Sequence, residues 1–127
     1  MKLVLVVEDE PGNAEILRMV LEAAGYRVSV APDGRAGLEL LSGERPAVIL
    51  ADFAMPYVTG AEMGLAVRAN CGLRDIPFVI LSGFSQDTVR AAFDDYDSFV
   101  AKPLYPEVVV PVVAYFARYG RPSSKSF

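Results

Sequence analysis

Short apolar runs alternate along this chain with longer segments in which apolar residues recur three or four positions apart. A continuous apolar run of about five residues is typical of a strand buried on both faces, and the wider spacing is typical of an amphipathic helix. The runs predict strands over Leu3–Val7, Arg27–Ala31, Ala47–Ala51, Pro77–Leu81 and Phe99–Ala101. The spaced segments predict helices from Pro11 to near Gly25, from Gly34 to near Gly43, and over Ala61–Ala69, Ser85–Phe93 and Pro106–Tyr119.

The order of these elements is a strand followed by a helix, repeated along the chain. This alternation predicts a parallel sheet with helices on both faces, because parallel strands need crossover connections. The common arrangement of this kind is a doubly wound α/β fold with the flavodoxin-like strand order 2-1-3-4-5. We expect a single domain over residues 1–119, and the small, polar residues 120–127 to form a flexible tail.

Composition excludes several classes of function. The chain has 127 residues, of which 53% are hydrophobic, and its formal net charge is −4 with no basic run. This balance argues against binding to nucleic acid or to an anionic membrane. Cys71 is the only cysteine, which excludes an internal disulfide and suits a reducing cytoplasm. The absence of histidine excludes histidine catalysis and a phosphohistidine on this chain.

Polar residues follow the predicted strands. Glu8 and Asp9 come after the first strand, Asp52 after the third, Ser82 after the fourth and Lys102 after the fifth. Taken singly, each is more often a helix cap, a turn residue or a surface charge. In a doubly wound sheet, however, the carboxyl ends of these strands meet at the edge where ligands bind. Their joint placement therefore favours one functional site.

Crowded carboxylates at that edge need a cation to neutralise them. Mg²⁺ prefers oxygen ligands and takes carboxylates, waters and phosphate oxygens. Asp9 and Asp52 can supply the carboxylates, and Glu8 can hold a water. The acids therefore predict a magnesium site.

The other residues at the edge suit phosphoryl transfer. A carboxylate such as Asp52 can attack phosphorus, provided that positive charge stabilises the phosphoryl oxygens. Lys102 can provide part of that charge, and the Ser82 hydroxyl can donate to another oxygen. Gly83 leaves room for a bulky donor to approach.

Four motifs together resemble the receiver domains of two-component response regulators, and the resemblance covers residues 3–119. They are Val6-Val7-Glu8-Asp9-Glu10, Ile49-Leu50-Ala51-Asp52-Phe53-Ala54-Met55-Pro56 followed by Gly60, Leu81-Ser82-Gly83, and Phe99-Val100-Ala101-Lys102-Pro103. The resemblance implies that Asp52 accepts a phosphoryl group from a histidine kinase or a histidine phosphotransfer protein. It also implies a Mg²⁺ ion bound by Glu8, Asp9, Asp52 and the backbone carbonyl of Ala54.

The resemblance further implies a conformational switch. Ser82 should turn towards the phosphoryl group and Phe99 should rotate into the vacated space, which changes the surface of helix 4, strand 5 and helix 5. The peptide bond before Pro103 should be cis. Thr59 stands where the family commonly has aspartate, and we expect it to cap the following helix. Asp94–Asp97 replaces the usual small residues before strand 5, so the path of that loop is left open.

The last predicted helix has more apolar residues than a core stripe needs. Val109, Val113 and Phe116 form a plausible core stripe, and Pro111 should kink the helix or delay its start. The remaining apolar residues predict an interface for a homodimer or a target protein, with Val112, Tyr115 and Tyr119 as its candidate residues.

Two other functions remain open. The first is a phosphatase resembling the haloacid-dehalogenase superfamily, which would need a second acid two residues after the nucleophile, where this chain has Ala54. The second is a receiver that acts only as a docking module and is never phosphorylated. A stand-alone regulator, a relay intermediate and a piece of a longer protein are all compatible with the sequence.

Overall fold

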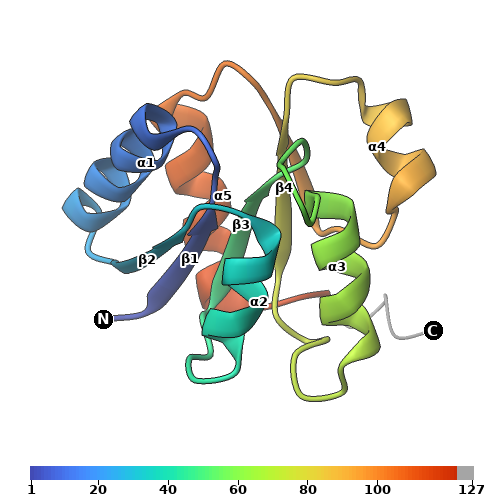
Figure 1. Ribbon diagram of the computed structural model, residues 1–127. Coiled ribbons are helices and arrows are strands. Elements are labelled where there is room, and N and C mark those ends of the chain that lie inside the picture. The colour runs from blue at the N-terminus through green and yellow to red at the C-terminus, as the bar shows by residue number, and fades with distance from the viewer. Residues whose placement is uncertain (123–127) are drawn as a thin grey trace.

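A computed structural model describes residues 1–122 of the chain. Five parallel strands form one sheet in the order β2-β1-β3-β4-β5, which confirms the predicted topology (Figure 1). The strands are β1 (Leu3–Val7), β2 (Arg27–Ala31), β3 (Val48–Asp52), β4 (Phe78–Ser82) and β5 (Ser98–Ala101). The helices are α1 (Pro11–Ala23), α2 (Gly34–Leu41), α3 (Gly60–Ala69), α4 (Gln86–Ala92) and α5 (Pro106–Tyr119).

Helices cover both faces of the sheet. In Figure 1, α1 and α5 lie on one face, and α2, α3 and α4 lie on the other. Each face buries its own apolar cluster, because successive side chains of a strand point to opposite faces: Leu5 joins one cluster and Val4 the other. Within residues 1–122, no helix combines the length and the hydropathy that a membrane span requires.

Two of the strands that carry site residues lie one residue further along than predicted. β3 extends through Asp52 and β4 through Ser82, so both residues are the last of their strands. The reason is that backbone pairing continues past the apolar run: Asp52 pairs with Leu81, and the Phe53 N–H donates to the Leu81 carbonyl at 2.9 Å. This pairing gives Asp52 and Ser82 the rigidity of the sheet.

The helix starts are capped by polar side chains. The α1 cap is Glu10, whose carboxylate accepts the Gly12 and Asn13 N–H groups, so the capping role does not fall to Asp9. Thr59 caps α3 as predicted. At the last helix, Pro111 does not delay the start, because α5 begins at Pro106.

Gly60 brings α3 close to the end of β3. A Cβ at this position would lie 2.3 Å from the Asp52 carbonyl oxygen, closer than real contacts allow. The Gly60 N–H also donates to the Phe53 carbonyl at 3.0 Å. The loop from Asp52 to α3 therefore turns tightly, and glycine is the residue that permits this approach.

The acidic loop before β5, whose path the sequence left open, is held by a buried charge network. The Asp97 side chain is fully buried and accepts the Phe78 N–H at 2.8 Å. It also accepts hydrogen bonds from the guanidinium groups of Arg68 at 2.8 Å and Arg121 at 2.9 Å. Arg121 belongs to the predicted tail, of which residues 123–127 lie outside the described part. The network joins α3, β4 and the segment after α5.

Asp97→Asn should destabilise the fold, because it removes the buried carboxylate that two largely buried guanidinium groups share and leaves them only the more exposed Asp95. Breaking a buried ion pair from one side costs about 3–5 kcal/mol. Urea unfolding at neutral pH should show a loss of this size. The exposed Asp94 provides a matched control, and Asp94→Asn should change the free energy of unfolding little. Equal stability of the two variants would show that the network does not hold the loop.

Candidate functional site

Three carboxylates meet at the carboxyl edge of the sheet. Glu8 follows β1 and Asp52 ends β3, and their exposed fractions are 2% and 5%. Asp9, next to Glu8, is exposed. One oxygen from each of the three carboxylates lies within 4.8 Å of the other two. The predicted convergence of these acids is therefore present in the structure.

Lys102 is the cation of this site. Its Nζ donates to Asp52 Oδ2 at 2.9 Å and lies 3.4 Å from Glu8 Oε2. Burial by itself would lower the pKa of Lys102, but the hydrogen bond and the charges of Asp52 and Glu8 outweigh it and raise that pKa. The amine therefore stays charged beside the acids.

The negative charge of the Glu8 carboxylate is poorly stabilised by its surroundings. Burial, followed by the charge of Asp52, raises the pKa of Glu8 from 4.5 to about 7. The Glu10 N–H donates to one Glu8 oxygen at 3.2 Å, whereas the buried Oε2 accepts no hydrogen bond from the residues that the structure describes. Lys102 alone therefore does not fully neutralise the negative charge of ionised Glu8. An oxygen-only ligand set with an unsatisfied buried oxygen fits a hard divalent cation such as Mg²⁺.

Ser82 ends β4, the strand that pairs with β3 and its terminal Asp52, and Gly83 follows it. The Ser82 side chain is buried, and its Oγ accepts the Phe84 N–H at 2.8 Å. The hydroxyl is thus turned towards the loop that follows β4. A Cβ on Gly83 would meet nothing within 4 Å, so the space beside Gly83 is open.

The other predicted residues are spread around this centre. Phe99 is half-buried on β5, and its ring centroid lies 6.3 Å from that of Tyr96. Ala54 is exposed in the loop that follows β3. The Lys102–Pro103 peptide bond is cis, as predicted. The expected roles of Phe99 and of the Ala54 carbonyl stay predictions.

One aromatic pair near the site was not foreseen from the sequence. The rings of Phe53 and Phe84 make an edge-to-face contact with centroids 5.7 Å apart. Phe53 follows β3 and Phe84 follows β4, which joins the two loops beside Asp52 and Ser82. No local pattern links residues this far apart, so the pair had no signal in the sequence.

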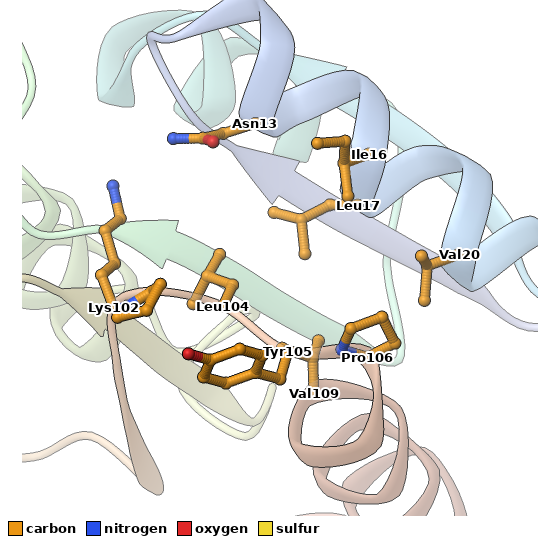
Figure 2. Close-up of a pocket in the computed structure, with 10 residues that line it drawn as sticks. Asn13, Ile16, Leu17, Val20, Lys102, Leu104, Tyr105, Pro106 and Val109 are labelled. Carbon is orange, nitrogen blue, oxygen red and sulfur yellow. The ribbon is translucent and has the colours of Figure 1, made fainter.

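An apolar groove runs from the site between α1 and the start of α5. Its volume is about 300 Å³, and Lys102 forms part of its wall. In Figure 2, Lys102 and Asn13 lie at one end of the groove and Val20 lies at the other. The apolar lining comes mainly from Ile16, Leu17, Val20, Leu104, Pro106 and Val109.

Comparison with protein families gives a clear match. The model of the response regulator receiver domain matches residues 4–114. One curated relative is the DNA-binding response regulator MtrA of Mycolicibacterium smegmatis, which is 32% identical over 109 residues. The match covers 84% of this chain but only 46% of MtrA, so it spans less than half of that protein.

Solved structures match over nearly the whole chain. The signal receiver domain of a signal transduction histidine kinase from Syntrophus aciditrophicus has a TM-score of 0.86 and 32% identity, and the match covers 92% of this chain and 90% of that one. The response regulator TrrA of Thermotoga maritima, solved in complex with Mg²⁺–BeF, has a TM-score of 0.79 and 28% identity. That match covers 91% of this chain and 99% of TrrA.

Glu8→Gln should stabilise the metal-free protein at alkaline pH. Between pH 4.5 and about 7 the folded chain keeps a proton on Glu8 that the unfolded chain has released, so the free energy of unfolding falls as pH rises. Glutamine cannot ionise and avoids this loss. Relative to the unsubstituted chain, the gain should be on the order of 2 kcal/mol at about pH 8 and much smaller at about pH 5.

Urea unfolding in the presence of a chelator measures this difference. Glu39→Gln, which changes an exposed glutamate of α2, should behave alike at both pH values. A gain from Glu8→Gln that is the same at both pH values would contradict a raised pKa.

Proposed function

Because this chain belongs to the response regulator receiver domain family, we propose that Asp52 accepts a phosphoryl group from a partner's phosphohistidine in a Mg²⁺-dependent reaction. As a receiver domain of two-component systems, the chain is a signalling module rather than a conventional enzyme. The observation that carries the proposal is the contact of 2.9 Å between the Lys102 ammonium and the Asp52 carboxylate, set within the acidic cluster. The proposed domain extends over residues 1–119.

The proposed reaction is a direct displacement at phosphorus. A carboxylate oxygen of Asp52 attacks the phosphorus atom, and an O–P bond forms as the N–P bond of the donor breaks. The electron pair of that bond goes to the donor's imidazole, which takes up a proton. The Lys102 ammonium stabilises the negative charge on the phosphoryl oxygens. This chemistry needs no histidine on the acceptor, in agreement with the sequence.

Glu8, Asp9, Asp52 and the backbone carbonyl of Ala54 would hold the Mg²⁺ ion. When bound, the ion supplies positive charge that Lys102 alone does not provide. The unsatisfied Glu8 Oε2 and the raised pKa of Glu8 support this assignment, because both point to an uncompensated acid. The Mg²⁺–BeF complex of TrrA supports it by similarity.

Ser82 and Phe99 form the proposed switch. Ser82 Oγ would leave the Phe84 N–H and donate to a phosphoryl oxygen, which draws the loop after β4 towards the site. Phe99, half-buried on the edge strand, would rotate into the space that Ser82 leaves. The surface formed by α4, β5 and α5 changes as a result and carries the signal.

The proposed phosphodonor is a histidine kinase or a histidine phosphotransfer protein, acting on this chain in the cytoplasm. The groove of Figure 2 supports a protein donor, since it continues the site into an apolar surface beside Lys102. Ile16 on its α1 side is 57% exposed and available for contact. A nucleic-acid or membrane partner is not part of the proposal, given the net charge of −4.

Asp52→Asn should abolish phosphorylation, because the amide cannot serve as the nucleophile. The chain is incubated with acetyl phosphate and Mg²⁺, and the phosphorylated form is counted by intact-protein mass spectrometry. Asp94→Asn should label as well as the unsubstituted chain, and a chelator should suppress labelling of both. Undiminished labelling of Asp52→Asn would mean that another residue is the acceptor. No labelling of any form would favour a receiver that acts only by docking.

The phosphorylated form should be long-lived, with a half-life of minutes or longer. Hydrolysis needs a water in line with the O–P bond, and resemblance to the receiver family places the residues two after the acceptor and two after the hydroxyl beside its path. Here they are Ala54 and Phe84, which cannot orient a water or take its proton. Ala54→Glu should therefore change the rate of phosphoryl loss, followed by mass spectrometry after removal of the donor. A half-life of seconds for the unsubstituted chain would contradict this explanation.

A further inference from the structure

The ring contact between Phe53 and Phe84 joins the loops that follow β3 and β4. Phe53 comes directly after Asp52, and Phe84 is two residues after Ser82. The two rings meet edge to face, with centroids 5.7 Å apart and an angle of 68° between their planes. This geometry is favourable for an aromatic pair, and such a pair contributes more than the burial of its apolar surface alone. The contact is therefore an attractive link between the acceptor strand and the loop beside the hydroxyl.

The two partners of this contact are held very differently. The Phe53 N–H donates to the Leu81 carbonyl at 2.9 Å, and the Phe53 carbonyl accepts the Gly60 N–H at 3.0 Å, so its backbone is fixed on both sides. The Phe53 side chain is half-buried and packs against the core cluster on the α2 and α3 side of the sheet. Phe84 follows Gly83, where a Cβ would meet nothing within 4 Å, and Phe84 itself is 53% exposed. Phe53 is thus the anchor of the pair, and Phe84 is the residue that is held.

Phe84 in turn holds the Ser82 hydroxyl through its backbone. The Phe84 N–H donates to Ser82 Oγ at 2.8 Å, and the hydroxyl donates to the Phe84 carbonyl at 3.4 Å. One residue therefore engages the hydroxyl both as an acceptor and as a donor. Ser82 has to give up these bonds before it can donate to a phosphoryl oxygen. Whatever fixes the position of Phe84 therefore also restrains Ser82.

We infer that Phe53 is a positioning residue for the Ser82 hydroxyl: its ring holds Phe84, and Phe84 keeps the hydroxyl turned towards its own loop until a phosphoryl group is present. The inference rests on the proposed function, because it concerns the movement of Ser82 in the proposed switch. The contact stabilises the unphosphorylated arrangement alone, so it weakens the binding of a phosphoryl group. Loss of the ring should strengthen that binding by the amount that the aromatic pair contributes, which is about two- to tenfold in Kd.

Binding of beryllofluoride in the presence of Mg²⁺ measures this effect, since beryllofluoride mimics a phosphoryl group on a carboxylate. Phe53→Leu removes the ring but keeps an apolar side chain, and it should lower Kd about two- to tenfold in isothermal titration calorimetry. Phe84→Leu should lower Kd by a similar factor. The double variant should gain no more than either single one, because both substitutions remove the same contact.

Two further variants separate positioning from packing. Phe53→Tyr keeps the ring and should keep the Kd of the unsubstituted chain. Tyr57→Leu is the matched control, because it removes an 84% exposed ring from the same loop, and it should also leave Kd unchanged. A ring that serves packing alone would lower the free energy of urea unfolding when it is removed, without strengthening the binding of beryllofluoride.

Backbone dynamics of the metal-free, unphosphorylated chain test the contact without depending on phosphorylation. The order parameter of the Phe84 amide, measured by ¹⁵N relaxation, should fall from about 0.85 towards 0.6 or below in Phe53→Leu. An unchanged order parameter or an unchanged Kd in Phe53→Leu would overturn the inference, as would additive gains in the double variant. Failure of the unsubstituted chain to bind beryllofluoride would overturn the proposed function, and the order parameter would then still decide whether the Phe53 ring holds Phe84.

Discussion

The contact of the Lys102 ammonium with Asp52 and Glu8 is the interaction on which the site depends. Two carboxylates buried at one sheet edge repel each other, and desolvation adds to the penalty of their ionisation. One lysine compensates this charge only in part, as the raised pKa of Glu8 shows. Because ionising Glu8 is costly in this setting, the site should respond strongly to added positive charge and to a phosphoryl group on Asp52.

The fold brings these charges together and keeps them there. Glu8, Asp52 and Lys102 belong to or directly follow three of the parallel strands, so backbone pairing sets their separation rather than flexible loops. The close approach of Gly60 to the Asp52 carbonyl ties the next helix to the same point. The buried Asp97 holds the opposite end of β5 through Arg68 and Arg121. A rigid frame of this kind suits a module in which one loop and one aromatic residue are proposed to move.

Two hollows adjoin the site and share part of their lining. The groove between α1 and the start of α5 opens directly beside Lys102, which suits the approach of a phosphodonor. A second hollow is lined by Phe99 of β5 and by Val108 of α5, and Tyr105 lines both this hollow and the groove. Both hollows adjoin β5 or the residues after it, since Lys102 follows this strand and lines both, and Phe99 lies within it.

The sequence by itself determined the order of the elements, the strand order and the meeting of Glu8, Asp9, Asp52, Ser82 and Lys102. Apolar periodicity reports local backbone geometry, and a parallel sheet then places the strand ends together. Tertiary structure decided that β3 and β4 lie one residue further along than predicted, and that Asp97 pairs with Arg68 and Arg121. It also decided the burial of Glu8. Burial and ion pairing depend on groups distant along the chain, and periodicity carries no information about them.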